Sequence, residues 1–132
     1  MNSVRSPLVL VVDDENPIRQ MERRILEKAG YRVIEAPGGV EGVAILKDGK
    51  PLDLLIADLD MPELGGDEMV RQIRAARPDL KVLYVTAHID RLLDVRKMLW
   101  EGEAFLDKPF TAKGLLEAVA LLLYGTLSAG KS

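Results

Sequence analysis

Acidic, hydroxyl and basic side chains follow four short apolar runs in this sequence. They are Asp13-Asp14, Asp58, Thr86 and Lys108. If the runs are parallel strands, the carboxyl ends of those strands meet at one edge of a sheet, and these side chains would lie together there. Carboxylates beside a cation and a hydroxyl fit phosphoryl transfer, in which an acceptor oxygen is aligned while negative charge is neutralised. The sequence therefore predicts a phosphoryl-transfer site at that edge.

The apolar runs alternate with helical patterns along the chain. The first run, residues 8–12, is too short for a core helix and rich in β-branched residues, which is typical of a buried strand. Asn16 is predicted to cap the first helix, with Pro17 at its first helical position and Gly30 at its end. Strict alternation predicts an α/β fold, a (βα)5 doubly wound, five-stranded parallel sheet with helices on both faces. We expect strands at 8–12, 32–36, 52–57, 82–85 and 104–106, and further helices at 39–47, 66–76, 90–100 and after Thr111.

Composition limits the classes of protein that are possible. The 132 residues, 48% of them hydrophobic, predict one domain, with a core at about 7–124 and a short polar tail at 125–132. The chain has no cysteine, so it has no disulfide or thiolate metal site. A net charge of -3 argues against direct binding of nucleic acid, and no apolar run is long enough to cross a membrane. We therefore expect a cytoplasmic protein.

Four sequence strings around the polar residues occur in a set order. They are Val11-Val-Asp-Asp-Glu15, then Asp58-Leu-Asp-Met-Pro62 with Gly65-Gly66, then Val85-Thr-Ala87, and last Phe105-Leu-Asp-Lys-Pro-Phe110. Each string alone is weak evidence for a family, because short apolar-acidic strings recur by chance. With all four in order, the chain resembles the receiver domain of bacterial response regulators, in particular the single-domain chemotaxis type, from Val9 to about Leu123. The resemblance implies a flavodoxin-like fold.

The resemblance also implies a role for each residue at the predicted edge. Asp58 would be the phosphoacceptor. Asp14 would bind Mg²⁺ (or Mn²⁺) together with Asp58, Asp13 would act mainly through a metal-bound water, and the backbone carbonyl of Asp60 would complete the protein ligands. Carboxylates in contact repel by roughly 4 kcal/mol per pair at an effective dielectric constant near 20, so cations must offset them. Lys108 would pair first with Asp58 and then with the transferred phosphoryl group.

A conformational switch is the further implication of the resemblance. The Thr86 hydroxyl would move toward the phosphoryl group and Phe105 would follow it inward, reshaping the face of the fourth helix, fifth strand and fifth helix for an unknown output partner. The peptide bond Lys108-Pro109 would be cis. A histidine kinase or histidine phosphotransfer protein would donate the phosphoryl group, and the domain, a monomer or phosphorylation-dependent dimer, would catalyse only its own phosphorylation and dephosphorylation. The output face would comprise residues 90–100, 104–106 and 111–123.

Three positions depart from the common family pattern. Asp60 places a second carboxylate two residues after the acceptor, at a position that tunes dephosphorylation in the family. His88 lies two residues after Thr86, where the family also varies, although a lone loop histidine is usually just exposed. Gly102 comes one place later than in the commonest pattern, as in receivers attached to hybrid histidine kinases. Asp60 and His88 therefore bear on the lifetime of the phosphoryl group.

Each site residue also has a simpler structural interpretation. Acidic residues after a strand often cap the next helix, Asp58 could begin a turn, Lys108 alone would usually be solvated and Phe105 would usually pack in the core. Only the position of these residues at a common edge favours a site.

The order and presence of the site residues argue against two alternative functions. Asp58-Leu-Asp60 also resembles the nucleophile motif of haloacid dehalogenase-type phosphohydrolases, but in those enzymes the acidic pair comes last, whereas here Asp13-Asp14 comes first. A pseudo-receiver, serving only for interaction, would lack the acceptor, a metal acid or the lysine, and all are present. The remaining alternative is that the chain is a receiver fragment of a larger regulator or hybrid kinase.

Overall fold

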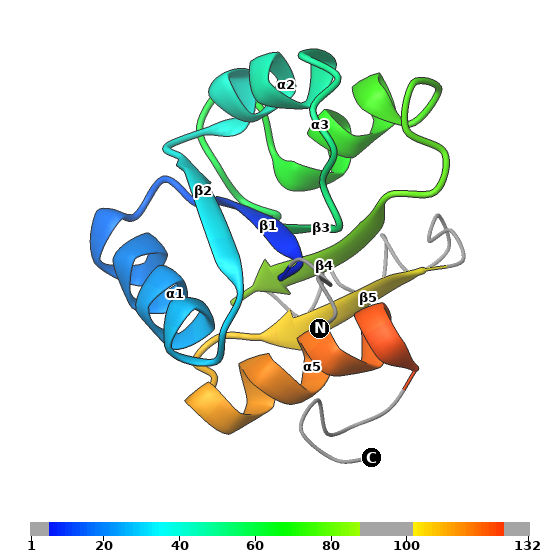
Figure 1. Cartoon of the computed structure of the whole chain (residues 1–132). Helices are drawn as coiled ribbons and strands as arrows, with labels where there is room; N and C mark the ends of the chain where they lie inside the picture. Colours follow the sequence, from blue (N-terminus) through cyan, green and yellow to red (C-terminus); the bar gives the residue numbers. More distant parts are fainter. Residues whose placement is uncertain (1–5, 88–101, 126–132) are drawn as a thin grey trace.

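Five parallel strands form one sheet in the computed structural model, which describes residues 6–87 and 102–125. Their order is β2-β1-β3-β4-β5 (Figure 1). Since β1 pairs with β2 on one side and with β3 on the other, the direction of winding reverses between them, and ligands of doubly wound sheets bind outside the carboxyl ends of the strands at such a reversal. The strands are β1 Leu8–Val12, β2 Arg32–Ala36, β3 Leu54–Asp58, β4 Lys81–Thr86 and β5 Glu103–Asp107.

Helices cover both faces of this sheet. α1 and α5 lie on one face, and α2 and α3 lie side by side on the other (Figure 1). Their bounds are α1 Asn16–Lys28, α2 Gly39–Lys47, α3 Gly66–Ile73 and α5 Ala112–Tyr124. The predicted doubly wound α/β fold is confirmed. The predicted helix 90–100 and His88 lie outside the described residues.

Alternate residues of each buried strand feed the two halves of the core. In β1, Leu10 and Val12 belong to the cluster under α2 and α3, whereas Val9 and Val11 belong to the cluster under α1 and α5. Successive side chains of a strand point to opposite faces, so a strand covered on both sides reads as a continuous apolar run. This is the physical origin of the apolar runs in the sequence.

The first helix begins one residue earlier than predicted. Glu15 is its N-cap and makes no side-chain cap hydrogen bond, so the prediction that Asn16 caps this helix is wrong. The Asn16 side chain accepts a hydrogen bond from Arg19 instead. Pro17 lies in the first turn as expected, and Gly30 follows the end of the helix with φ of 100°, a conformation that glycine adopts without strain.

The bounds of four other elements differ from those predicted. The strand predicted at 52–57 is β3, which starts at Leu54. Leu54 is its first residue to pair with the neighbouring strands, with Val9 of β1 and Lys81 of β4. The helix predicted at 66–76 ends at Ile73. Beyond it the Ala76 amide bonds to the Ile73 carbonyl three residues back, and the Arg77 amide is shared between the carbonyls of Ile73 and Arg74, so the chain tightens into turns. β4 and β5 each extend beyond their predicted ends.

The last helix is capped as expected. The Thr111 side chain accepts a hydrogen bond from the Gly114 amide at 2.9 Å, and α5 buries its own Leu115 and Val119 against the sheet. Among residues 6–87 and 102–125, no helix is long and apolar enough to cross a membrane.

Candidate functional site

Backbone hydrogen bonds beyond the strands bring the predicted residues to one edge. The Asp13 amide donates to the Ala36 carbonyl at 3.3 Å, so β1 stays aligned with β2 past its end. The Lys108 amide likewise donates to the Thr86 carbonyl at 2.8 Å, holding β5 against β4. Asp58 is the last residue of β3, between these two pairs of strands. The sheet therefore places Asp13, Asp58, Thr86 and Lys108 at the same edge, as the sequence predicts.

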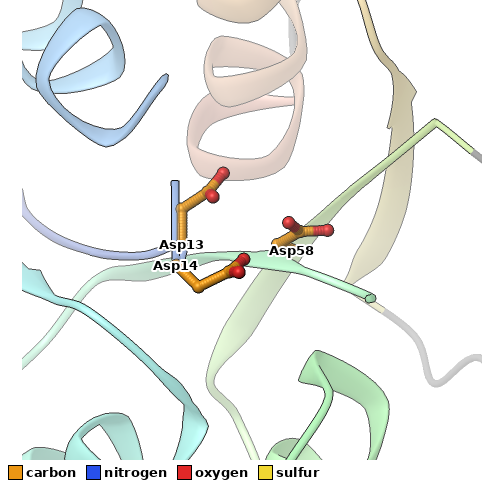
Figure 2. Close-up of side chains that lie close together, drawn as sticks. All are labelled: Asp13, Asp14 and Asp58. Carbon is orange, nitrogen blue, oxygen red and sulfur yellow. The ribbon is translucent and has the colours of Figure 1, made fainter. Parts of the chain in front are cut away.

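Three carboxylates lie close together at this edge (Figure 2). Asp13, Asp14 and Asp58 each offer an oxygen, and these oxygens all lie within 4.8 Å of one another. Asp13 and Asp58 are buried, while Asp14 is exposed. Burial raises the pKa of the Asp13 and Asp58 carboxyls above the ordinary value, although hydrogen bonds from backbone amides and the charge of Lys108 oppose the rise.

Turn hydrogen bonds orient two of these carboxylates. Asp13 Oδ1 accepts from the Glu15 amide at 2.9 Å, and Asp58 Oδ1 accepts from the Asp60 amide at 3.1 Å. Each residue thus bonds the backbone two residues on, as aspartates in turns commonly do. The other oxygen of each carboxylate, Oδ2, is the one that faces Lys108. The simple turn interpretation of Asp58 is therefore correct, and Asp13, for which helix capping was the simple interpretation, makes the same kind of turn.

Lys108 is the cation at the centre of the acidic cluster. Its Nζ atom lies 3.1 Å from Asp58 Oδ2, 3.3 Å from Asp13 Oδ2 and 3.4 Å from Glu15 Oε1, and its side chain is 13% exposed. Burial alone would lower the pKa of Lys108, but its hydrogen bond to Asp58 and the charge of Asp13 outweigh burial and raise that pKa. The sequence predicted the partner Asp58, and it missed Asp13 and Glu15.

The switch candidates occupy neighbouring strands. Thr86 is buried, and its hydroxyl donates to Asp60 Oδ2 at 3.3 Å, a contact that sequence reasoning missed. Phe105 is half-buried and packs with Tyr84 at a ring-centroid distance of 5.8 Å. The peptide bond Lys108-Pro109 is cis, as the resemblance implied. The switch roles of Thr86 and Phe105 stay predictions.

Two glycines let the loop after β3 close tightly over the site. A Cβ atom on Gly66 would lie 2.5 Å from the Asp58 carbonyl oxygen, and one on Gly65 would lie 2.4 Å from the Leu59 carbonyl oxygen. Real Cβ atoms do not approach so closely. The start of α3 can therefore rest directly on the backbone of the proposed acceptor only because both residues are glycine.

Glu22, on α1, is an acid that sequence reasoning missed. It is 1% exposed, and neither side-chain oxygen has a hydrogen-bond partner within the part of the chain that the structure describes. Burial, followed by the negative charge of Asp13, raises the pKa of Glu22 to about 8. Its four-residue spacing from Ile18 and Leu26 puts it on the apolar stripe of the helix, which is the signal that could have revealed it.

The residues present fit a hard divalent cation. Carboxylate oxygens are the ligands that Mg²⁺ prefers, and Mg²⁺ usually takes one or two carboxylates and keeps several waters. A cavity of about 230 Å³ beside the cluster leaves room for waters or a phosphoryl group. It is lined by Asp14, Glu15, Asp58, Asp60, Ala87 and Lys108.

The doubly wound sheet, with an acidic, lysine-bearing site at its carboxyl edge, agrees with the receiver domain that the sequence resembles. Residues 9–120 match the sequence model of the response regulator receiver domain. The chain is 34% identical over 120 residues to the sensor kinase CckA of Brucella abortus (strain 2308), covering 89% of this chain and 13% of the kinase. It is 36% identical over 118 residues to the response regulator MprA of Mycobacterium sp. (strain KMS), covering 89% of this chain and 51% of MprA.

Solved structures of receiver domains also match this fold. The response regulator protein TrrA from Thermotoga maritima, in complex with Mg(2+)-BeF, has a TM-score of 0.79 and 32% identity, covering 89% of this chain and 99% of TrrA. The chain belongs to the response regulator receiver domain family, the receivers of two-component systems. It spans about half the length of MprA and a smaller share of CckA.

Proposed function

We propose that Asp58 accepts a phosphoryl group from the phosphohistidine of a histidine kinase or histidine phosphotransfer protein. The observation that carries this proposal is the contact of a buried acceptor carboxylate with Lys108 Nζ, beside two further aspartates, at the carboxyl edge of the sheet. Family membership supports a kinase or phosphotransfer partner.

The chemical step is a displacement at phosphorus. An Asp58 carboxylate oxygen forms a bond to phosphorus while the phosphorus–nitrogen bond of phosphohistidine breaks, and the imidazole nitrogen leaves with the electron pair and is protonated. The product is an acyl phosphate. The Lys108 ammonium, held at 3.1 Å from the acceptor, then pairs with an oxygen of the transferred group. Hydrolysis of the acyl phosphate releases inorganic phosphate and restores the carboxylate.

Asp14, Asp58 and the backbone carbonyl of Asp60 would hold Mg²⁺ or Mn²⁺, with Asp13 acting through water. A bound divalent cation supplies positive charge that offsets the carboxylates and the phosphoryl oxygens. The convergence of three carboxylate oxygens within 4.8 Å supports this ligand set.

The output is proposed to be a changed surface rather than a chemical product. Thr86 and Phe105 lie on adjacent strands. Movement of the Thr86 hydroxyl toward a phosphoryl group would therefore change the packing of the Phe105 ring and of α5. The described part of the output face includes the exposed hydrophobic side chain of Leu121, on α5, which supports a protein partner there. We take residues 1–132 as a single receiver acting in the cytoplasm, as a monomer or a phosphorylation-dependent dimer.

Labelling with a small phosphodonor tests the acceptor. Incubation with Mg²⁺ and acetyl phosphate is expected to add one phosphoryl group, seen by intact-mass spectrometry, and Asp58→Asn is expected to abolish the addition because the amide oxygen is a poor nucleophile. Asp79→Asn is the matched control, since Asp79 is exposed just before β4, at the opposite edge of the sheet.

Undiminished labelling of Asp58→Asn would contradict the assignment of the acceptor. Multiple turnovers of a generic phosphomonoester per protein molecule would instead favour the phosphohydrolase alternative.

A further inference from the structure

An arginine on α1 binds the backbone between the two N-terminal site aspartates. Arg19 Nη1 donates to the Asp13 carbonyl oxygen at 2.7 Å, and Arg19 Nε donates to Glu35 Oε1 at 2.9 Å. Its remaining nitrogen, Nη2, donates to the Asn16 side chain. The Arg19 side chain is 13% exposed. One guanidinium therefore joins the end of β1, the start of α1 and the strand β2.

The carbonyl that Arg19 binds has a special position. It belongs to the peptide unit that links Asp13 to Asp14, and a peptide unit is planar. Holding its oxygen therefore sets the plane from which the side chains of both aspartates emerge. Mg²⁺ demands near-ideal octahedral geometry, so its affinity is sensitive to the direction of each ligand.

We infer that Arg19 is a positioning residue that sets the Mg²⁺ affinity of the site through the Asp13–Asp14 peptide. This inference rests on the proposed function, because it presupposes that the acidic cluster binds Mg²⁺. Arg19 itself touches the backbone and not the metal. Outer hydrogen bonds that orient metal ligands typically account for 10- to 100-fold in metal affinity, and one backbone contact belongs near the lower end of that range.

Arg23 offers a matched control on the same helix. Its Nη1 atom donates to the other oxygen of Glu35 at 2.7 Å, and its Nε atom donates to Glu27 at 2.9 Å. Arg19 and Arg23 thus share one carboxylate on β2, but it is Arg19 that donates to the Asp13 carbonyl. Comparing the two arginines separates that contact from the loss of a positive charge and from the loss of a Glu35 ion pair.

The test is Mg²⁺ binding by calorimetry to Arg19→Gln, Arg23→Gln and the unsubstituted protein, each shown to be folded by circular dichroism. We expect the Kd for Mg²⁺ to rise about tenfold in Arg19→Gln and to stay within twofold in Arg23→Gln. The direction is diagnostic. Removing a positive charge near a cation site tightens cation binding by Coulomb's law, so weaker binding identifies lost positioning.

Labelling by acetyl phosphate gives a second readout. In Arg19→Gln the Mg²⁺ concentration for half-maximal labelling is expected to rise about as much as the Kd, whereas the labelling rate at saturating Mg²⁺ stays within twofold. Should Arg19→Gln fail to fold, Arg19→Lys replaces it, because a single ammonium keeps the charge but cannot reach all three acceptors in the fixed geometry of a guanidinium. Its Kd is expected to rise at least threefold.

Three outcomes would overturn the inference alone while leaving the proposed function intact. They are unchanged or tighter Mg²⁺ binding by Arg19→Gln, unchanged binding by a folded Arg19→Lys where that variant is the one tested, and equal weakening in Arg23→Gln. Failure of the unsubstituted protein to bind Mg²⁺ would instead overturn the proposed Mg²⁺ site, and this inference with it.

Discussion

Lys108 faces more negative charge than a single ammonium can neutralise. Carboxylate oxygens of Asp58, Asp13 and Glu15 lie within 3.4 Å of its Nζ atom, and Asp14 joins the cluster from the exposed side. The site is therefore net negative, which favours a divalent cation and raises the proton affinity of nearby acids. Glu22, a buried residue of α1, has its pKa raised by burial and further by the negative charges of Asp13 and Asp58.

Glu22→Gln is expected to change how stability depends on pH. In the folded protein burial raises the pKa of Glu22 from 4.5 to about 8, so between these values the folded state binds a proton that the unfolded state has lost. The free energy of unfolding therefore falls as pH rises through this window, by about 1.4 kcal/mol per pH unit at most. Glutamine does not titrate, so the variant lacks this fall.

The measurement is urea denaturation from pH 5 to pH 8.5 in metal-free buffer. The difference between unsubstituted protein and Glu22→Gln isolates the titration of Glu22, since other groups are common to both. Glu41→Gln, at an exposed position on α2, is the control and should leave the pH dependence unchanged. Parallel curves for Glu22→Gln and the unsubstituted protein would contradict this prediction.

At the scale of elements, arginines after α3 connect segments that share no backbone ladder. Arg77 Nε donates to the Leu46 carbonyl at 2.8 Å and thereby satisfies an end of α2, whose last carbonyls have no partner within the helix. Arg74, at the end of α3, donates to the Leu80 carbonyl at 2.7 Å and forms an ion pair with Glu103, the first residue of β5. These contacts fix the turn that leads into β4.

Glu103→Ala is expected to destabilise the fold by about 3 kcal/mol, because removing one partner of a buried ion pair leaves the other charge uncompensated. The side chains of Arg74 and Glu103 are 6% and 1% exposed. Replacing both, by Arg74→Met and Glu103→Leu, is expected to cost less than Glu103→Ala alone. Chemical denaturation measures both values, and a cost below about 1 kcal/mol for Glu103→Ala would show that the pair contributes little.

At the scale of the whole molecule, the proposed ligands of Mg²⁺ come from different strands. Asp14 follows β1 and Asp58 ends β3, so binding requires the assembled sheet and stabilises the folded state over the unfolded state. At a Mg²⁺ concentration of ten times Kd, the free energy of unfolding is expected to increase by about 1.4 kcal/mol.

Thermal denaturation with and without Mg²⁺ measures this effect. Asp14→Ala is expected to lose the Mg²⁺-dependent rise in Tm while keeping a folded structure, because Asp14 is exposed and its side chain packs little. Na⁺ at matched ionic strength is the control for screening. An undiminished rise in Asp14→Ala would count against Asp14 as a ligand.

Much of the fold and the set of proposed site residues could be predicted from the sequence by itself. Strand and helix patterns are local, since a buried strand here is a run of five or six residues and the apolar stripe of a helix recurs every three or four residues. Strict alternation then required a parallel sheet, and a parallel sheet brings Asp13, Asp58, Thr86 and Lys108 to one edge. The bounds of elements were less predictable, because Asn16 and the end of α3 depend on side-chain contacts of Arg19 and on turn hydrogen bonds.

The contacts that these residues make depend on long-range packing. Lys108 contacts Asp13 and Glu15, which lie far from it in the sequence. Arg19, on α1, binds the Asp13 carbonyl at the end of β1. Glu22 is buried with no hydrogen-bond partner for its carboxylate among the described residues. Such contacts depend on the packing of helices against the sheet and on the conformations of long side chains, neither of which is encoded in local periodicity. The local sequence pattern thus sets which residues gather at the sheet edge, whereas the packing of helices against the sheet sets their partners and the directions in which the pKa values of Asp13, Asp58 and Lys108 shift.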